Sequence, residues 1–254
     1  MPPHDSPPAD PALDVRLSAV RGRIRQAAER AGRTADEVRL VGASKTVAAA
    51  RVADIVRAGL ADVGENRVQE AEAKAPAVLA ALGDGGAHGP APTWHLIGHL
   101  QSNKARRAVA RFDWIESLDA PELADALDRI AGELGRRPVV LVEVNVAGEA
   151  SKSGVAPQDA AALVAHAAGL KHLDVRGLMT VGPLVETPDA ARPAFQKMRA
   201  LLVEARRGLE ARDDATAARF DQLSMGMSGD FEVAIEEGAT VVRVGSALFG
   251  ARLT

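Results

Sequence analysis

Lys45 stands where a predicted buried strand meets a predicted helix. A short apolar run at 40–43 precedes it, and the segment 47–58 that follows has helical periodicity and ends at Gly59, a common helix terminator. A lysine in this position lies at the mouth of a sheet or barrel, where α/β proteins place their chemistry. In its neutral form the amine can attack an aldehyde and form a Schiff base. A solvated lysine at a strand end is the alternative interpretation, so the other strand ends must decide between the two.

Two Gly/Ser-rich turns near the end of the sequence indicate an anion site. One begins at Ser224 and the other at Arg243, and the second also holds Gly245 and Ser246. Such turns offer backbone N–H groups and hydroxyls to an anion, and (β/α)8 barrels often bind phosphate after strands seven and eight. A purely structural role, as turn and cap residues, is the alternative for either turn alone.

A Schiff-base lysine and a phosphate site together suggest pyridoxal 5′-phosphate (PLP). Lys45 would form the Schiff base, the two turns would hold the phosphate, and Arg243 would face the pyridine nitrogen. An arginine can only donate a hydrogen bond there, so it keeps that nitrogen unprotonated and weakens the ring as an electron sink. The predicted site therefore retains the cofactor well but supports carbanion chemistry poorly.

Other polar residues follow the predicted strands. They are Asn66, His95 with His99, Ser117, Asn145 and Thr180. His95 and His99 are four residues apart with no third ligand evident, so we expect no metal site and expect His95 to line the pocket as a hydrogen-bond donor. Lys152 follows the fifth strand, either as a second amine near the mouth or, as we expect, as an exposed loop residue.

The elements that would position these residues alternate between strand and helix. Predicted strands cover 39–44, 62–65, 93–98, 114–118, 139–146, 175–181, 222–225 and 241–245. Predicted helices cover 47–58, 67–82, 101–111, 121–135, 157–169, 188–212 and 229–237, and an extra helix precedes the first strand. Eight near-continuous apolar strands with a helix in each gap predict an α/β fold of the (β/α)8 TIM-barrel type, with a doubly wound open sheet as the alternative.

Composition excludes several other classes of protein. The 254 residues carry a net charge of −3 with both signs interspersed, which argues against a nucleic-acid or anionic-membrane partner. Cysteine is absent, and no apolar run approaches the roughly 20 residues of a membrane span. Residues 1–10 form a Pro-rich tail that we expect to be disordered and that lacks the features of a signal peptide. Residues 11–254 form a single predicted domain, and we expect a cytoplasmic protein.

Tyrosine is also absent from the sequence. Racemisation needs a second acid/base on the opposite face of the substrate, commonly a tyrosine, and the short segment after the last strand leaves no room for a second domain. We therefore expect a PLP-binding protein without catalysis. Two alternatives stay open: a PLP-dependent amino-acid racemase that uses another acid/base such as His95, and a cofactor-free Schiff-base aldolase that uses Lys45 and the same anion site.

Seven short motifs resemble a known family over roughly residues 13–252. They are VGASKT at 41–46, GENRVQE at 64–70, WHLIGHLQSNK at 94–104, SKSG at 151–154, GLMT at 177–180, SMGMS at 224–228 and RVGSALFG at 243–250. Together they resemble the YggS/PROSC family of PLP homeostasis proteins. This family is similar in fold to the N-terminal barrel of alanine racemase (fold type III of PLP proteins) and lacks its C-terminal β-domain.

The resemblance implies a role for each matching residue. Lys45 would bind PLP covalently, Arg243 would contact the ring nitrogen, and the phosphate would lie against Ser224, Gly245 and Ser246. The pocket would further be lined by Asn66, His95, Asn145 and Met179, and Lys152 matches a lysine proposed in some members as a second PLP attachment point. The implied function is to hold PLP, balance vitamin B6 and amino-acid pools, and supply PLP-dependent apo-enzymes, as a monomer without established enzymatic activity. His99, where many members have proline, and Ser246, where threonine is frequent, are departures from the pattern.

Overall fold

The computed structural model of the chain describes residues 11–83, 91–149, 152–183 and 185–250. The predicted disordered tail at 1–10 lies outside these ranges. No helix in the described part of the chain combines the length and apolar character that crossing a bilayer requires.

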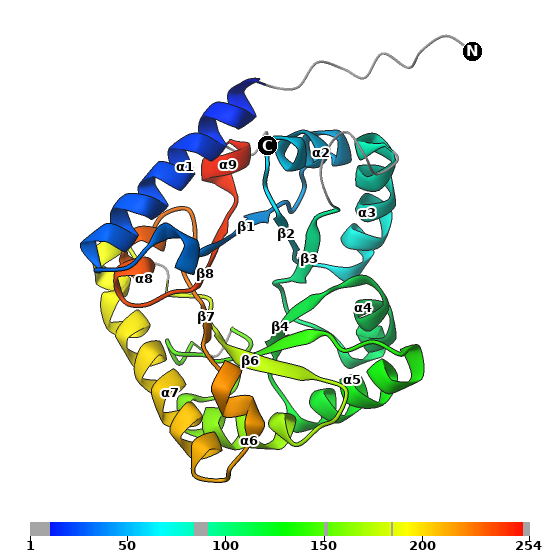
Figure 1. Cartoon of the computed structure of the whole chain (residues 1–254), viewed down its shortest axis with the longest axis vertical. Helices are drawn as coiled ribbons and strands as arrows, with labels where there is room; N and C mark the ends of the chain where they lie inside the picture. The colour runs from blue at the N-terminus through cyan, green and yellow to red at the C-terminus, as the bar shows by residue number, and fades with distance from the viewer. Residues whose placement is uncertain (1–10, 84–90, 150–151, 184, 251–254) are drawn as a thin grey trace.

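Eight parallel strands close into a barrel, each paired with its neighbours in chain order and β1 paired with β8 (Figure 1). They are β1 (Arg39–Ala43), β2 (Asp62–Glu65), β3 (Thr93–Leu96), β4 (Trp114–Leu118), β5 (Val139–Glu143), β6 (Asp174–Met179), β7 (Gln222–Ser224) and β8 (Val241–Val244). The predicted (β/α)8 barrel is confirmed, and the open sheet is excluded.

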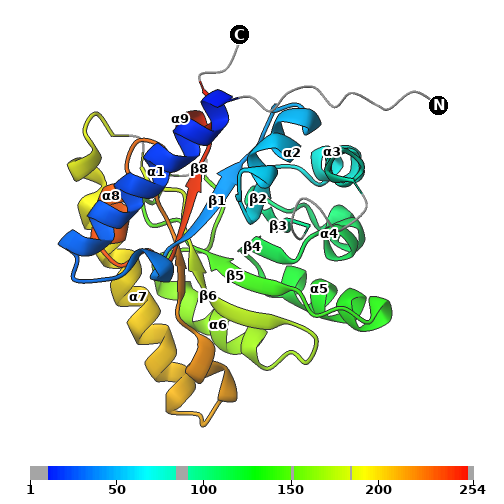
Figure 2. The ribbon, with the colours of Figure 1, turned by 45° about the horizontal axis from the view of Figure 1, so that its top comes forward.

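Helices surround the barrel on its outer face (Figure 1). They are α1 (Pro11–Arg30), α2 (Ala49–Arg57), α3 (Val68–Leu82), α4 (Ala105–Arg111), α5 (Pro121–Leu134), α6 (Ala160–Ala168), α7 (Arg192–Glu210), α8 (Phe231–Glu236) and α9 (Ser246–Phe249). The predicted N-terminal helix, α1, packs against α8 and α9, the helices that follow β7 and β8 (Figure 2).

Six of the predicted strands run one to three residues past the observed carboxyl ends, because the chain leaves the sheet at the barrel mouth. Beyond β5, the backbone N–H of Asn145 donates to the carbonyl of Val155, and Val144 forms an isolated bridge with the same residue. Asn145 therefore pairs with the following loop, and the N–H of Val146 donates to the carbonyl of Val144 in a turn instead of extending the barrel. These departures all lie at the carboxyl ends of strands, where the candidate site residues cluster.

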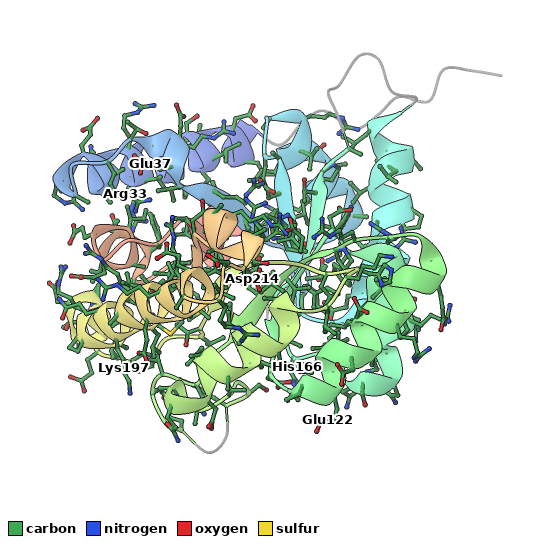
Figure 3. The ribbon with its side chains drawn as sticks, turned by 60° about the horizontal axis from the view of Figure 1, so that its bottom comes forward. Arg33, Glu37, Glu122, His166, Lys197 and Asp214 are labelled. Carbon is green, nitrogen blue, oxygen red and sulfur yellow. The ribbon has the colours of Figure 1, made fainter. Side chains whose placement is uncertain are left out.

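The core has two parts. Most buried apolar side chains lie between the strands and the helices. A smaller cluster fills the barrel itself and consists of Val41, Ile97, Trp114, Leu141, Met179 and Val241. Polar side chains of the helices, among them the labelled Glu122, His166 and Lys197, lie on the outside of the molecule (Figure 3).

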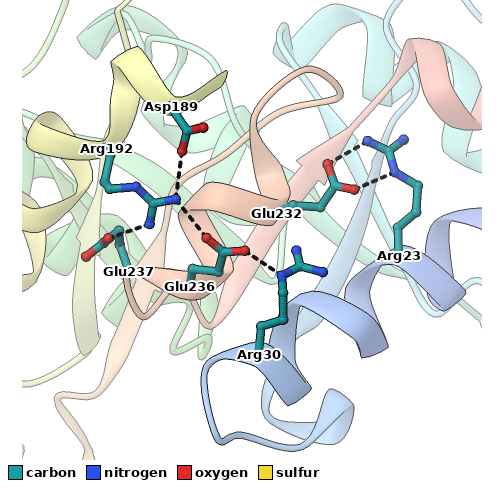
Figure 4. Close-up of polar contacts among 7 residues, drawn as sticks. All are labelled: Arg23, Arg30, Asp189, Arg192, Glu232, Glu236 and Glu237. Atoms are coloured by element: carbon teal, nitrogen blue, oxygen red, sulfur yellow. Dashed lines mark hydrogen bonds and ion pairs between the residues drawn. The ribbon is translucent and has the colours of Figure 1, made fainter. Parts of the chain in front are cut away.

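A network of ion pairs fixes α8, the helix that follows the first Gly/Ser-rich turn (Figure 4). Arg192 at the start of α7 bonds Glu236 and Glu237 at 2.8 and 2.7 Å. From the other side, Arg30 of α1 bonds the same Glu236 at 2.8 Å, and Arg23 and Glu232 pair at 2.7 Å. Isolated exposed pairs contribute little, but charges joined in a network contribute more. The network thus clamps α8, and with it the turn at 225–230, between α1 and α7.

Candidate functional site

A cavity of about 800 Å³ opens at the carboxyl ends of the strands. Five of the predicted site residues line it: Lys45, Asn66, Arg243, Gly245 and Ser246. Its other lining residues are Ala43, Thr46, Val47, Ala48, Arg51, Ile97, Val181, Met227, Ser228, Gly229, Phe249 and Gly250. Among these described residues three are cationic and none is Asp or Glu. The cavity is therefore built to receive an anion.

The turn that carries Lys45 is held in place by the buried ion pair between Glu65 and Lys74. The carbonyl of Ser44 accepts hydrogen bonds from the backbone N–H of Val47 at 2.9 Å and from Lys74 Nζ at 2.7 Å. The Ser44 hydroxyl donates to Glu65 Oε1 at 2.5 Å, and Lys74 also pairs with that carboxylate. These contacts fix the backbone on the N-terminal side of Lys45.

Thr46, which follows Lys45, has a φ angle of +66°. A β-branched residue in the left-handed region is a conformational outlier that costs on the order of 1–3 kcal/mol, and such strain concentrates at functional sites. The predicted helix at 47–58 begins only at Ala49 because this turn comes first. The strained turn aims the Lys45 side chain at the cavity that it lines.

The turns after β7 and β8 meet at Ser228. Its hydroxyl oxygen accepts hydrogen bonds from the backbone N–H groups of Gly245 at 3.1 Å and Ala247 at 3.3 Å. Gly226 has a φ angle of +93°, and a Cβ on it would come within 2.9 Å of the Phe231 backbone. Ser228 belongs to the quoted SMGMS motif but was missing from the predicted site residues. The Gly/Ser-rich pattern that pointed to Gly245 and Ser246 could also have pointed to Ser228.

His95 lies inside the barrel rather than among the described cavity-lining residues. Its Nδ1 is 2.7 Å from Glu116 Oε1, its Nε2 is 3.0 Å from Asp62 Oδ1, and its ring stacks on Trp114 at 4.9 Å. Burial lowers the pKa of His95, but the hydrogen bonds to the two carboxylates outweigh it and raise the pKa above its ordinary value. Both ring nitrogens face buried carboxylates, an arrangement that favours the protonated form of the ring.

Ser224 also lies in the interior, where it positions Arg243. Its hydroxyl donates to Glu116 Oε2 at 2.6 Å and accepts from Arg243 Nη1 at 2.5 Å. Arg243 Nη2 donates to the carbonyl of Thr180 at 2.6 Å. Burial raises the pKa of Glu116, but the hydrogen bond and charge of His95 and the charge of Arg243 bring it below the ordinary value. Glu116 therefore stays ionised and links His95 to Arg243.

Asn145 and Lys152 shape the loop after β5. Asn145 Nδ2 donates to the carbonyls of Glu149 and Lys152 at 2.8 and 3.2 Å. Lys152 Nζ donates to Glu149 Oε1 at 2.6 Å and to the carbonyl of Gly182 at 3.1 Å. Its side chain is only 18% exposed, so the expectation of an exposed loop residue is wrong. Met179 is fully buried in the barrel cluster beside Ile97, which lines the cavity.

Glu143, the last residue of β5, is a buried carboxylate that sequence reasoning missed. It is 5% exposed, and its Oε2 has no hydrogen-bond partner. Burial and the charge of Asp119 raise the pKa of Glu143 to about 7, although Arg243 favours its ionised form. Near neutral pH this group therefore exchanges a proton.

The raised pKa of Glu143 makes stability depend on pH. The unfolded group titrates near 4.5 and the folded group near 7, so the unfolded chain binds fewer protons between these values and stability falls as pH rises through this window. Glutamine at this position does not titrate, so Glu143→Gln removes the pH dependence. The free energy of unfolding of Glu143→Gln minus that of the unmodified chain should therefore be larger at pH 8 than at pH 4.5, by on the order of 3 kcal/mol. Urea unfolding in chelator-containing buffer measures this difference, and an equal effect at both pH values would contradict it.

Comparison with known proteins identifies the class of this barrel. Residues 15–253 match the family model of the alanine racemase N-terminal domain. The pyridoxal phosphate homeostasis protein of Aquifex aeolicus is 43% identical over 237 residues, covering 93% of this chain and 97% of that protein. The protein of the same name from Pseudomonas aeruginosa is 44% identical, covering 93% and 94%.

A solved structure gives the same result. PipY of Synechococcus elongatus PCC7942, determined with PLP bound, is 39% identical and superposes with a TM-score of 0.76 over 94% of this chain and all of that one. The chain belongs to the family of pyridoxal phosphate homeostasis proteins, within the alanine racemase N-terminal-domain class of barrels. The resemblance read from the sequence motifs is thereby confirmed.

Proposed function

We propose that this protein binds PLP in the barrel-mouth cavity and serves PLP homeostasis, with Lys45 as the covalent anchor and without catalysing a reaction of its own. The main support for this proposal is the lining of the cavity. Among its described residues are Lys45, Arg51 and Arg243, and none is Asp or Glu. The names of the relatives and the PLP bound in PipY support the same ligand. The supplied pool is cytoplasmic, its recipients are PLP-dependent apo-enzymes, and the chain acts as a monomer.

The residues present fit the phosphate group of PLP. The N–H groups of Gly245 and Ala247 converge on one hydroxyl oxygen, that of Ser228, and a phosphate oxygen is a stronger acceptor at the same place. Ser228 and Ser246 add hydroxyl donors at the cavity wall. We therefore assign the phosphate to Gly245, Ser246 and Ser228. Ser224 acts on the ligand through Arg243.

The residues also fit the aldehyde and the ring. Lys45 provides a primary amine among the described lining residues, and Arg243 is buried at the cavity floor with two of its N–H groups engaged by Ser224 and Thr180. Arg243 would donate a hydrogen bond to the pyridine nitrogen and would keep its own proton. Asn66 lines the cavity wall and would contact the ring there. When bound, PLP supplies an electrophilic aldehyde and a conjugated ring, and the protein retains both in place.

The racemase alternative needs a second acid/base near the substrate. The sequence has no tyrosine, and the alternative candidate, His95, has both ring nitrogens bound to carboxylates inside the barrel. A histidine so engaged cannot reach the opposite face of a substrate in the cavity. We therefore favour a holding function over racemisation.

Titration of the purified chain with PLP tests this function. We expect one equivalent to bind with a visible Schiff-base band, and inorganic phosphate to weaken that binding by competing for the N–H groups. In deuterated water, amino acids added to the loaded protein should keep their α-hydrogen. Exchange of the α-hydrogen would establish the racemase, whereas a colourless protein that takes up no PLP would favour the cofactor-free aldolase.

A further inference from the structure

His99, Asp119 and Glu143 come together at the carboxyl ends of β3, β4 and β5. One donor atom of each lies within 4.8 Å of the other two, and His99 Nδ1 is 3.1 Å from Asp119 Oδ2. None of the three lines the cavity that holds Lys45. They form a second polar site on the β3–β5 side of the barrel mouth.

Glu143 gives this site an unsatisfied acceptor. Only 5% of the residue is exposed, and its Oε2 has no hydrogen-bond partner in the described structure. A buried carboxylate oxygen without a donor is costly, and a second carboxylate beside it adds repulsion. A cation bound between Asp119 and Glu143 would remove both costs.

We propose that His99, Asp119 and Glu143 bind a divalent transition-metal ion, with Zn²⁺ as the best fit. An imidazole with two carboxylates suits Zn²⁺ or Mn²⁺, whereas Mg²⁺ and Ca²⁺ prefer oxygen ligands alone. Zinc bonds of about 2.0–2.1 Å place tetrahedral donors roughly 3.3 Å apart, which the His99–Asp119 pair already meets. Side-chain rotation closes the remaining gap to Glu143. Three protein ligands leave one coordination position open to water or a small ligand.

The chain contains internal controls for this proposal. His166 of α6 pairs with Asp125 of α5 at 2.7 Å (His166 is labelled in Figure 3), and His172, in the turn after α6, pairs with Asp128 of α5 at 3.4 Å. Among the residues that the structure describes, neither pair has a third ligand within metal-binding distance. A histidine–aspartate pair alone therefore should not bind the ion tightly. The buried third carboxylate distinguishes the site at the barrel mouth.

Zinc binding to the untagged, chelator-treated, PLP-free chain tests the proposal. Competition with a chromogenic zinc indicator should show one tight equivalent, and Co²⁺ should give a visible d–d spectrum. We expect His99→Ala and Glu143→Gln each to weaken this equivalent by about 100-fold or more. His166→Ala should leave it unchanged. His4 and His88 remain in every variant, so a site that they formed would survive these substitutions.

Two outcomes would overturn the proposal: the absence of a tight equivalent in the unmodified chain, or a zinc affinity in His99→Ala and Glu143→Gln that equals that of the unmodified chain. Circular dichroism separates these from misfolding, and Glu143→Gln keeps the side-chain volume. Since the titration contains no PLP, its failure leaves the proposed PLP function untouched.

Discussion

Replacing Lys45 with alanine is expected to abolish the visible Schiff-base band of the PLP-loaded protein. Lys45 supplies the primary amine among the described residues that line the cavity. Without it, PLP can be held only by its phosphate and ring contacts. Affinity should fall by roughly 10- to 100-fold, consistent with the loss of an anchoring interaction of about 1.5–3 kcal/mol. Absorption spectroscopy after gel filtration measures both effects.

Lys152→Ala is the matched control for Lys45→Ala. The Lys152 amine is held by Glu149 and the Gly182 carbonyl, so its removal should leave the band intact. Lys45→Ala should itself fold normally, since Ser44, Glu65 and Lys74 hold the turn without the Lys45 side chain. An unchanged band in Lys45→Ala would contradict the assignment of the anchor.

Replacing Glu116 with alanine is expected to lower the free energy of unfolding by about 3–5 kcal/mol, the cost of breaking a fully buried charge pair. Glu116 is completely buried and bonds His95 Nδ1 and the Ser224 hydroxyl, and its loss leaves both groups without this partner inside the barrel. Arg243 also loses the carboxylate 3.9 Å from its Nη1. Urea unfolding measures the change.

Glu72→Ala provides the surface comparison for Glu116→Ala. Glu72 pairs with Arg107 on the outer helices, where the two side chains are 30% and 49% exposed. Removing an exposed pair of this kind should cost at most about 1 kcal/mol. Similar losses in the two variants would show that the buried network contributes no more than a surface pair.

The fold could be predicted from the sequence because a parallel barrel repeats one local pattern. Each apolar strand followed by an amphipathic helix is visible on its own, and right-handed closure of eight such units needs no long-range information. Strand length was overestimated after β5, where Val144 and Val146 are apolar and buried, but Asn145 pairs with a loop residue and Val146 lies in a turn.

The site was predictable where local sequence fixes both position and direction. Lys45, Gly245 and Ser246 lie in turns directly after strands, and they line the cavity as expected. His95 and Ser224 are also at strand ends, but their side chains point into the barrel. Whether a strand-end side chain points inward or toward the mouth depends on register and tilt around the whole barrel, which no local pattern reveals.

The cluster of His99, Asp119 and Glu143 was beyond sequence reasoning for a related reason. Its members are separated by 20 and 24 residues and follow no metal-binding spacing. They meet only because β3, β4 and β5 are neighbours in the closed barrel. The sequence showed His99 as a departure from the family pattern but could not show which groups would face it.

Borohydride reduction of the PLP-saturated protein, followed by peptide mass mapping, identifies the lysine that carries the cofactor. If Lys45 anchors PLP, the pyridoxyl mass will appear on the peptide that contains Lys45, at about one equivalent per chain. A pyridoxyl group found instead on Lys152, or spread over several surface lysines, would contradict the assignment of the cofactor to this cavity.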